Sequence, residues 1–217
     1  MSASNRPNPI EPRPARRRLS APAAAALLAV ALSGCSVLPK SEPVQLLDPR
    51  PLTETATGSV DWSLSVARPE SDRARDSTRV LVRTADARLQ VLPAARWVAP
   101  APDLIRTLTI RHLRDAGALG RVEAAGAQTD RALLADLRRF ELSEADGDAL
   151  LATIEIEFRL YGSASAELAD RRLFRHTARA ESGDAPDLLR AFEAALGEAL
   201  GELTEWLIGQ PAPEPTV

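Results

Sequence analysis

One cysteine has the most distinctive chemical surroundings in this chain. Cys35 is the only cysteine, so no disulfide can form within the chain, and it follows Leu32-Ser33-Gly34. Ser33 and Gly34 are small enough for a peptidase to reach the backbone before Cys35, and the thiol can form a thioether. This arrangement predicts cleavage between Gly34 and Cys35 and covalent modification of the new N-terminal cysteine.

The residues before Cys35 contain the three parts of a secretory signal. Four arginines lie within residues 13–18, and residues 21–32 form an apolar run of about 12 residues that are almost all Ala, Leu and Val. A helix needs roughly 20 apolar residues to cross the hydrocarbon core of a bilayer. The sequence therefore favours a cleaved signal over residues 1–34 rather than a transmembrane anchor.

The tetrapeptide that ends at Cys35 resembles the lipobox of bacterial lipoproteins, Leu-[Ala/Ser]-[Gly/Ala]-Cys. The resemblance implies a diacylglycerol thioether and an N-acyl chain on Cys35, and two or more acyl chains give stable anchoring. An ordinary signal peptide followed by a chance cysteine is the alternative. Ser36, rather than an aspartate, follows the cysteine. By analogy with enteric bacteria, this favours the outer membrane, facing the periplasm, over the inner membrane.

The charge of the mature chain excludes one class of partner. Removing residues 1–34 removes five arginines and one glutamate, which leaves 22 basic residues, 29 acidic residues and a formal charge of −7. An acidic balance argues against binding to nucleic acid and against a polybasic grip on anionic lipid. The mature chain has 183 residues, which fits one domain with a tether and a tail.

The sequence contains no common catalytic or metal-binding motif. His112 and His176 are the only histidines, and neither has the spacing of a zinc site. We expect His112 to lie packed or exposed on a helix and His176 to lie in a strand. There is neither a Gly-x-Ser-x-Gly turn nor a phosphate-binding loop. The acidic stretch at residues 141–146 is expected to form a solvated loop, with calcium binding as the alternative. We therefore expect no catalytic residue, no metal, no cofactor beyond the acyl chains and no enzymatic activity.

The three tryptophans are candidates either for the core or for contact with a partner. Trp62 lies in an alternating apolar and polar segment, which indicates the core. Trp97 lies near three prolines and Trp206 lies near the C-terminus. Both are candidate partner contacts, with packing under the first helix as the alternative for Trp97 and capping of the core as the alternative for Trp206.

The apolar spacing predicts an α/β chain, specifically an α+β sandwich in which two main helices pack on one face of a mixed sheet. Residues 132–142 taken alone favour a helix. The other predicted elements are strands at 62–66, 79–83, 88–92, 122–124, 152–163 and 171–181, and helices from Pro102 to Gly117 and over 184–208. The first two strands after residue 78 form a hairpin.

The same patterns predict four segments of the chain. Residues 1–34 are the signal, 35–60 the lipidated cysteine and a tether that could hold a short strand, 61–210 the folded domain, and 211–217 a Pro-rich tail expected to be disordered.

Several landmarks together resemble the ABC-type transport auxiliary lipoproteins, a family that includes paraquat-inducible protein C. The resemblance covers roughly residues 45–210. Its landmarks are Trp-x-Leu-x-Val at 62–66, Ala-Arg-Trp at 95–97, Leu-x-x-Asp-Leu-x-x-Phe-Glu at 133–141, Ala-Phe-x-x-Ala at 191–195 and Glu-Trp-Leu at 205–207. The resemblance implies that residues 132–142 form a strand with Phe140 pointing inward, against their local preference.

The resemblance also implies a function and partners. Such lipoproteins accompany MCE-domain proteins, which shuttle lipids, and a permease–ATPase pair of the ABC type. The chain would then be the outer-membrane part of a system that moves lipids between membranes, with a homo-oligomer as one arrangement. The alternatives are a lipoprotein that itself holds a hydrophobic ligand and an assembly factor of the outer membrane.

Overall fold

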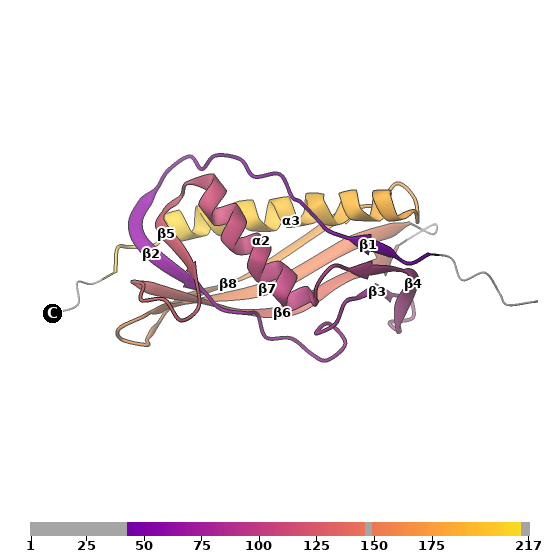
Figure 1. Cartoon of the computed structure of the whole chain (residues 1–217), viewed down its shortest axis with the longest axis horizontal. Coiled ribbons are helices and arrows are strands. Elements are labelled where there is room, and N and C mark those ends of the chain that lie inside the picture. Colours follow the sequence, from indigo (N-terminus) through magenta and orange to yellow (C-terminus); the bar gives the residue numbers. More distant parts are fainter. Residues whose placement is uncertain (1–42, 146–148, 214–217) are drawn as a thin grey trace, which may run out of the picture. The chain divides into compact units, whose positions relative to one another are not determined.

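The computed structural model describes residues 43–145 and 149–213, and Figure 1 shows their arrangement. They form one mixed sheet of eight strands and two helices. The strands are β1 (Gln45–Leu47), β2 (Val60–Val66), β3 (Arg79–Arg83), β4 (Leu89–Trp97), β5 (Leu119–Ala124), β6 (Arg131–Glu144), β7 (Leu150–Gly162) and β8 (Leu168–Arg179), and the helices are α2 (Ala101–Ala116) and α3 (Ala185–Ile208). The predicted α+β class, with helices packed on a mixed sheet, is confirmed.

Strand β6 organises the sheet. One edge pairs along its whole length with β7, which pairs in turn with β8, and both pairings are antiparallel. The other edge pairs in parallel with β2 near Arg131 and with β3 near Leu142. The β2–β3 loop, residues 67–78, crosses the gap between these two pairings and forms a bridge from Glu70 to Asp136. The sheet order is therefore β1-β4-β3-β6-β2-β5, with β7 and β8 beyond β6.

A bulge explains why β6 has the sequence pattern of a helix. Leu133 and Leu137 are buried with the regular alternation of a strand, and the register with β7 then shifts between Leu137 and Arg139. One extra residue moves the inward side to even positions, so that Phe140 and Leu142 are buried next. The spacings of four and then three residues match a helical period. The helical prediction from local pattern was wrong, and the strand implied by the family resemblance is confirmed.

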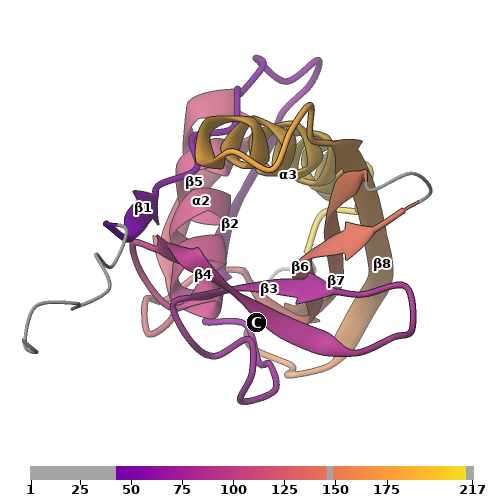
Figure 2. The same cartoon turned by 90° about the vertical axis from the view of Figure 1, so that its right-hand side faces the viewer.

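The two helices cover the same face of the curved sheet, as Figure 2 shows in the end-on view. Helix α2 packs against β5, and α3 packs along β7 and β8. Pro102 lies in the first turn of α2, where its missing N–H leaves no bond unmade. Gly117 ends α2 with a positive φ of 67°, as a left-handed cap requires. The predicted boundaries of both helices are confirmed within one or two residues.

Aromatic side chains fill the space between the sheet and α3. Trp97, Phe140 and Phe192 form a group in which the ring centroids are 4.7–5.0 Å apart. These three residues come from β4, β6 and α3. The group therefore joins two parts of the sheet to the C-terminal helix. Edge-to-face and tilted ring contacts of this kind stabilise the fold beyond the effect of burying apolar area.

The predicted tether contains a short strand, as the sequence allowed, and contacts the domain at that strand and at Ala56. Strand β1 runs parallel to β4, and Leu47 is buried. Farther along, the N–H of Ala56 donates to the carbonyl of Ala116 at 3.1 Å. Strand β1 packs against the domain because it pairs with the backbone groups of β4 that would otherwise form an unpaired sheet edge. At the other end, the carbonyl of Pro211 accepts a bond from Arg131, while residues 214–217 of the predicted tail lie outside the described residues.

Candidate functional site

The predicted lipidation site lies before the first described residue. Gly34 and Cys35 belong to residues 1–42, which are outside the described part of the chain. Cleavage and acylation therefore stay predictions from the sequence. Neither described helix combines the length and the apolarity needed to cross a membrane.

Trp97 is part of the core rather than a surface for a partner. Its side chain is 1% exposed and packs between Phe140 of β6 and Phe192 of α3. The sequence left partner contact and packing under the first helix open for Trp97, and the structure places the ring in the core against Phe192 of α3. The β3–β4 hairpin carries Trp97 back over the sheet, and the predicted partner contact is not available to a buried ring.

Trp206 joins the end of α3 to the start of β8. Its indole Nε1 donates to the carboxylate of Asp170 at 2.9 Å, and Gln210 donates to the same carboxylate oxygen at 3.0 Å. The bond from Trp206 lowers the pKa of Asp170 below its ordinary value, with the bond from Gln210 acting in the same direction. The ring also contacts Phe174 edge to face at 5.8 Å. Only 8% of the side chain is exposed, so its role in this domain is to cap the core.

The two histidines make structural contacts. His112 lies on the buried face of α2, where its Nδ1 is 3.1 Å from the hydroxyl of Thr53, and burial lowers its pKa. His176 on β8 lies 2.8 Å from the carboxylate of Glu202 on α3. Within residues 43–145 and 149–213, no three His, Cys, Asp or Glu side chains are grouped closely enough to hold a metal ion.

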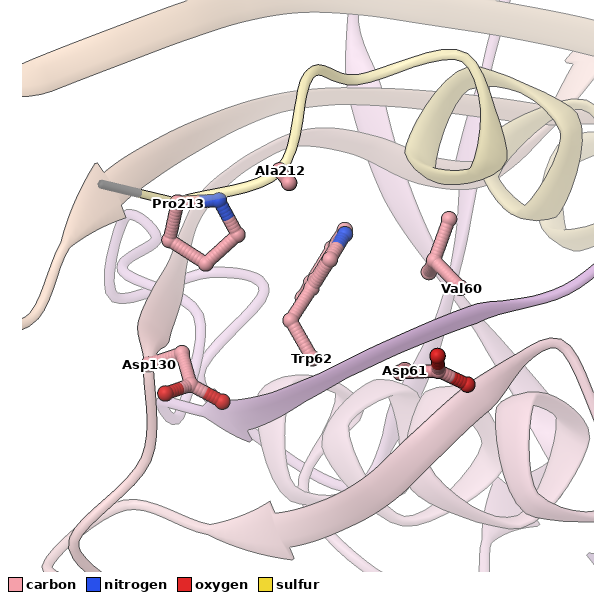
Figure 3. A pocket seen from close by; sticks show the side chains of 6 residues that line it. All are labelled: Val60, Asp61, Trp62, Asp130, Ala212 and Pro213. Atoms are coloured by element: carbon pink, nitrogen blue, oxygen red, sulfur yellow. The ribbon is translucent and has the colours of Figure 1, made fainter. Parts of the chain in front are cut away.

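A pocket of about 410 Å³ lies beside Trp62, as Figure 3 shows. Strand β2 supplies Trp62, and the last described residues of the chain cover one side of its ring. The lining residues are Val60, Asp61, Trp62, Asp130, Ala212 and Pro213. They form an aromatic surface with two carboxylates, without the histidine or cysteine that would make a nucleophile–base pair there.

The carboxylate of Asp130 is already held by the neighbouring strand. It accepts the backbone N–H of Ser63 at 2.7 Å and the hydroxyl of Ser63 at 2.6 Å. The hydroxyl bond, followed by the backbone bond, lowers the pKa of Asp130. An ionised carboxylate held in this way suits the positioning of β2 against the loop before β6 better than proton transfer.

Arg131 is buried behind the ring of Trp62. Its guanidinium carbon is 5.1 Å from the ring centroid, and Nη2 donates to the carbonyl of Pro211 at 2.5 Å. Nε and Nη1 have no hydrogen-bond partner in the described part of the chain. Burial lowers the pKa of Arg131. The cation–π contact joins the first residue of β6 to Trp62 of β2, and the hydrogen bond joins it to the C-terminal segment.

The sequence reasoning missed a buried charge cluster centred on Glu141. We predicted residues 141–146 to be a solvated loop, but residues 141–144 are the end of β6 and Glu141 is fully buried, while Asp146 lies outside the described residues. Its carboxylate pairs with Arg75, with Nε of Arg83 at 2.5 Å and with Nε of Arg139 at 3.0 Å. The acidic sequence context hid this role, because the arginines come from separate segments that only the fold brings together.

The cluster holds Glu141 in its ionised form. Burial by itself would raise the pKa of this carboxyl, but the hydrogen bond from Arg83 and the charge of Arg75, with the bond from Arg139, outweigh burial and lower the pKa. Glu141 points away from Phe140 and so lies on the sheet face opposite the helices. The β2–β3 loop, which carries Arg75, covers it there. The ion pairs of this cluster therefore attach the β2–β3 loop to the sheet.

Comparison with known protein families gives a match over most of the chain. The model of the family described as "ABC-type transport auxiliary lipoprotein component" matches residues 45–203. A crystal structure of a Xanthomonas campestris protein of family DUF330 is similar at 30% identity and a TM-score of 0.72, covering 76% of this chain and 95% of that protein. The crystal structure of an uncharacterized protein shares the fold at 14% identity and a TM-score of 0.57, covering 76% of this chain and 97% of that one. The comparison with curated proteins gives no match.

The match spans the whole described domain from β1 into α3, including the strand β6 that the resemblance in the sequence implied. Its start at residue 45 coincides with the first residue of β1. The chain therefore belongs to the family of ABC-type transport auxiliary lipoprotein components.

Proposed function

We propose that this chain is the lipid-anchored periplasmic component of an MCE/ABC-type system that moves lipids between membranes. Its acylated Cys35 would hold the domain at the outer membrane, and its partners would be an MCE-domain protein and an ABC permease with its ATPase. The observation that carries the proposal is the family match over residues 45–203, which follows a lipobox-like sequence at residues 32–35.

A docking role fits the chemistry of the described domain. Its prominent charged groups, such as Glu141 and Arg75, are paired with each other rather than grouped around a reactive side chain. An acyl anchor joined to a rigid domain fixes the position of a complex without spanning the bilayer. This favours the role of a fixed contact for a periplasmic conduit over that of a catalyst.

The alternative of a lipoprotein that holds a hydrophobic ligand requires an apolar cavity between the sheet and the helices. The rings of Trp97, Phe140 and Phe192 contact one another in that space. The pocket beside Trp62 lies at the edge of the domain and is lined partly by carboxylates. These features favour docking over the storage of a lipid.

The partner is tested by mild crosslinking in the native host, followed by purification through a tag on this chain. We expect an MCE-domain protein to be recovered together with the permease or the ATPase. An equally abundant outer-membrane lipoprotein with the same tag is the control. Recovery of the permease and ATPase without any MCE-domain protein would remove the lipid-transport part of the proposal, and recovery of the chain alone would remove the whole of it.

The proposed location in the outer membrane is tested separately, by density-gradient fractionation of the inner and outer membranes. We expect the chain in the outer-membrane fraction, and we expect Ser36→Asp to move it to the inner membrane in an enteric host. Cofractionation of the unaltered chain with inner-membrane markers would contradict the proposed location while leaving the transporter partners in place.

A further inference from the structure

Exposed aliphatic side chains gather on β1 and β4. The described residues have eight large hydrophobic side chains that are well exposed, and five of them belong to these two strands or lie next to them. The five are Val44 (51% exposed), Leu46 (68%), Leu89 (37%), Val91 (37%) and Val98 (45%). A contiguous group of this kind marks an interaction surface, whereas single exposed aliphatic residues do not.

The strand register places Leu46 of β1 on the outer face of the sheet, away from the helices. Leu46 lies opposite Arg96, and the next pair, Leu47 and Trp97, is buried in the core. Because successive side chains alternate between faces, Leu46 and Arg96 point outward. The same alternation brings Val44 and Val98 to the outer side.

The register of the hairpin extends this surface along β4. Val91 pairs with Leu81, and Leu89 pairs with Arg83. Arg83 reaches the carboxylate of Glu141 on the outer face, so its partner Leu89 lies on that face too. We define the β1–β4 face as the five aliphatic residues together with the arginines between them. Its residues are Val44, Leu46, Leu89, Val91, Val98, Arg79 and Arg96.

The β1–β4 face carries positive charge that is not neutralised locally. Arg79 and Arg96 are paired across β3 and β4, and neither forms an ion pair within residues 43–145 and 149–213. Planar guanidinium groups bind phosphate oxygens in a bidentate manner. Aliphatic side chains next to unpaired arginines suit the boundary between phosphate headgroups and acyl chains.

The position of the chain start brings this face within reach of a bilayer. Strand β1 and the hairpin β3–β4 lie at the end of the domain where the described chain begins, and the C-terminal segment lies at the opposite end (Figures 1 and 2). Val44 lies nine residue steps after Cys35, with eight residues between them. Even fully extended, these steps span at most about 30 Å. An acylated Cys35 therefore keeps the β1–β4 face close to the membrane surface.

We propose that the β1–β4 face rests on the headgroup layer of the membrane that holds Cys35, with its aliphatic side chains at the acyl boundary and Arg79 and Arg96 on lipid phosphates. The inference rests on the lipidation of Cys35 in the proposed function. It adds an orientation: the opposite end of the domain, with the pocket beside Trp62, points into the periplasm. That end is then the one presented to the conduit.

Single labels test this orientation on the full mature, acylated protein. Cys35 is the only cysteine, so its acylation leaves no free thiol and one introduced cysteine takes one environment-sensitive fluorophore. Leu46→Cys and Val91→Cys report on the β1–β4 face. Leu168→Cys and Leu173→Cys are matched controls, because these leucines are exposed at 48% and 41% on β8. The proteins are inserted into vesicles of phosphatidylethanolamine and phosphatidylglycerol that carry a headgroup quencher.

We expect the quencher to reduce fluorescence at least twofold at positions 46 and 91 and little at positions 168 and 173. Equal quenching at all four positions, or none at 46 and 91, would overturn the proposal. In detergent, a change at position 46 that depends on protein concentration would show that a second copy covers the face, which would also overturn it.

A second measurement separates this inference from the proposed function. Here the fluorophore is attached at Val98→Cys. When Leu46→Ser and Val91→Ser are added to that variant, we expect the quencher to have little effect on the fluorescence. The intact mass and the crosslinking to the partner are expected to stay unchanged. Mass spectrometry checks that Cys35 is acylated, and crosslinking checks the MCE-domain partner. Failed quenching in a chain that is acylated and crosslinks normally would remove only the membrane orientation.

Discussion

The carboxylate of Glu141 on β6 pairs with the guanidinium of Arg75, which lies 66 residues earlier in the β2–β3 loop. Both side chains are buried, and Arg83 and Arg139 contact the same carboxylate. The loop has few apolar residues to hold it, so this charge cluster attaches it to the sheet together with the backbone bonds of Glu70 to β6. A buried ion pair of this kind need not make the fold more stable than apolar side chains in the same place would. Removing one of its partners, however, strongly lowers the free energy of unfolding.

Replacing Glu141 by glutamine should destabilise the domain strongly. The change leaves Arg75 buried with only Asp72 as an acidic partner and removes the shared acceptor of Arg83 and Arg139. Loss of one partner from a buried pair lowers the free energy of unfolding by about 3–5 kcal/mol. Urea denaturation followed by circular dichroism measures the change.

The control for this variant is Asp86→Asn. Asp86 pairs with Arg88 in the β3–β4 turn, and both side chains are more than half exposed. Exposed pairs contribute about 0–1 kcal/mol, so this variant should unfold close to the unaltered protein. Equal stability of Glu141→Gln and Asp86→Asn would show that the β2–β3 loop is held by other contacts.

Glu141 should also make the domain sensitive to acid. Its folded-state pKa is below the ordinary value of 4.5, so the unfolded chain binds the proton first as the pH falls. The stabilisation is fully present above pH 4.5 and is lost as the pH falls through the lowered pKa. Unfolding free energies measured from pH 6 downward should therefore fall less steeply in Glu141→Gln than in the unaltered protein. Parallel curves would contradict the assignment.

Burial of His112 should make the stability of the domain depend on pH in a second, higher range. Burial lowers its pKa below the ordinary value of 6.5, with a weaker opposing effect of Asp115. The unfolded chain therefore binds a proton that the folded chain does not, and stability decreases as the pH falls below about 6.5, by at most about 1.4 kcal/mol per pH unit. His112→Gln should flatten this slope between pH 7.5 and 5.5.

Thr53→Ala is the matched variant for that measurement. It removes the hydroxyl that lies 3.1 Å from the imidazole but keeps the buried histidine. The slope should then persist, although the total stability falls. A slope that survives in His112→Gln would place its origin in another group.

Gly120 lies where two strands approach too closely for a side chain. A Cβ at this position would lie 2.2 Å from the carbonyl oxygen of Asp61 on β2. Gly120→Ala must push β5 away from β2, and forced packing of this kind reduces stability by about 1–3 kcal/mol. Gly201→Ala in α3 is the control, because no atom lies within 4 Å of its added Cβ. There the removal of glycine from a helix should stabilise the domain by about 0.5–1 kcal/mol. Thermal denaturation of the two variants should shift in opposite directions.

The elements that could be predicted from the sequence are those whose local pattern and tertiary environment agree. Residues 152–160 of β7 alternate between apolar and polar side chains, with the apolar ones buried, and α2 has a proline in its first turn and a glycine cap at Gly117. Strand β6 was the exception. Its bulge between Leu137 and Arg139 changes the inward side, which imitates a helical period. Pairing with β7 on one edge and with β2 and β3 on the other makes these residues a strand. The paired strands are separate segments of the chain, so the local pattern of β6 does not reveal this pairing.

The functional residues were predictable only where the chemistry is contained in a short segment. Cys35 stands out because the thiol and its small neighbours are consecutive. Glu141 could not be identified, since its three arginines come from the β2–β3 loop, from β3 and from β6 itself. The two readings of Trp97 could not be separated from the sequence for a related reason: its neighbours in sequence include prolines, and its neighbours in space are Phe140 and Phe192.

Cys35→Ala should separate folding from function. The aromatic core and the Glu141 cluster are built from residues of the described domain, so we expect the variant to unfold at the same urea concentration as the unaltered protein. Without a thiol no thioether can form, so the chain should lose its membrane anchor and fail to restore transport in a deletion strain. A version exported to the periplasm through an ordinary signal peptide tests the requirement for anchoring itself. Full complementation by that soluble version would show that position at the membrane is dispensable, and would favour a freely diffusing carrier over a fixed docking component.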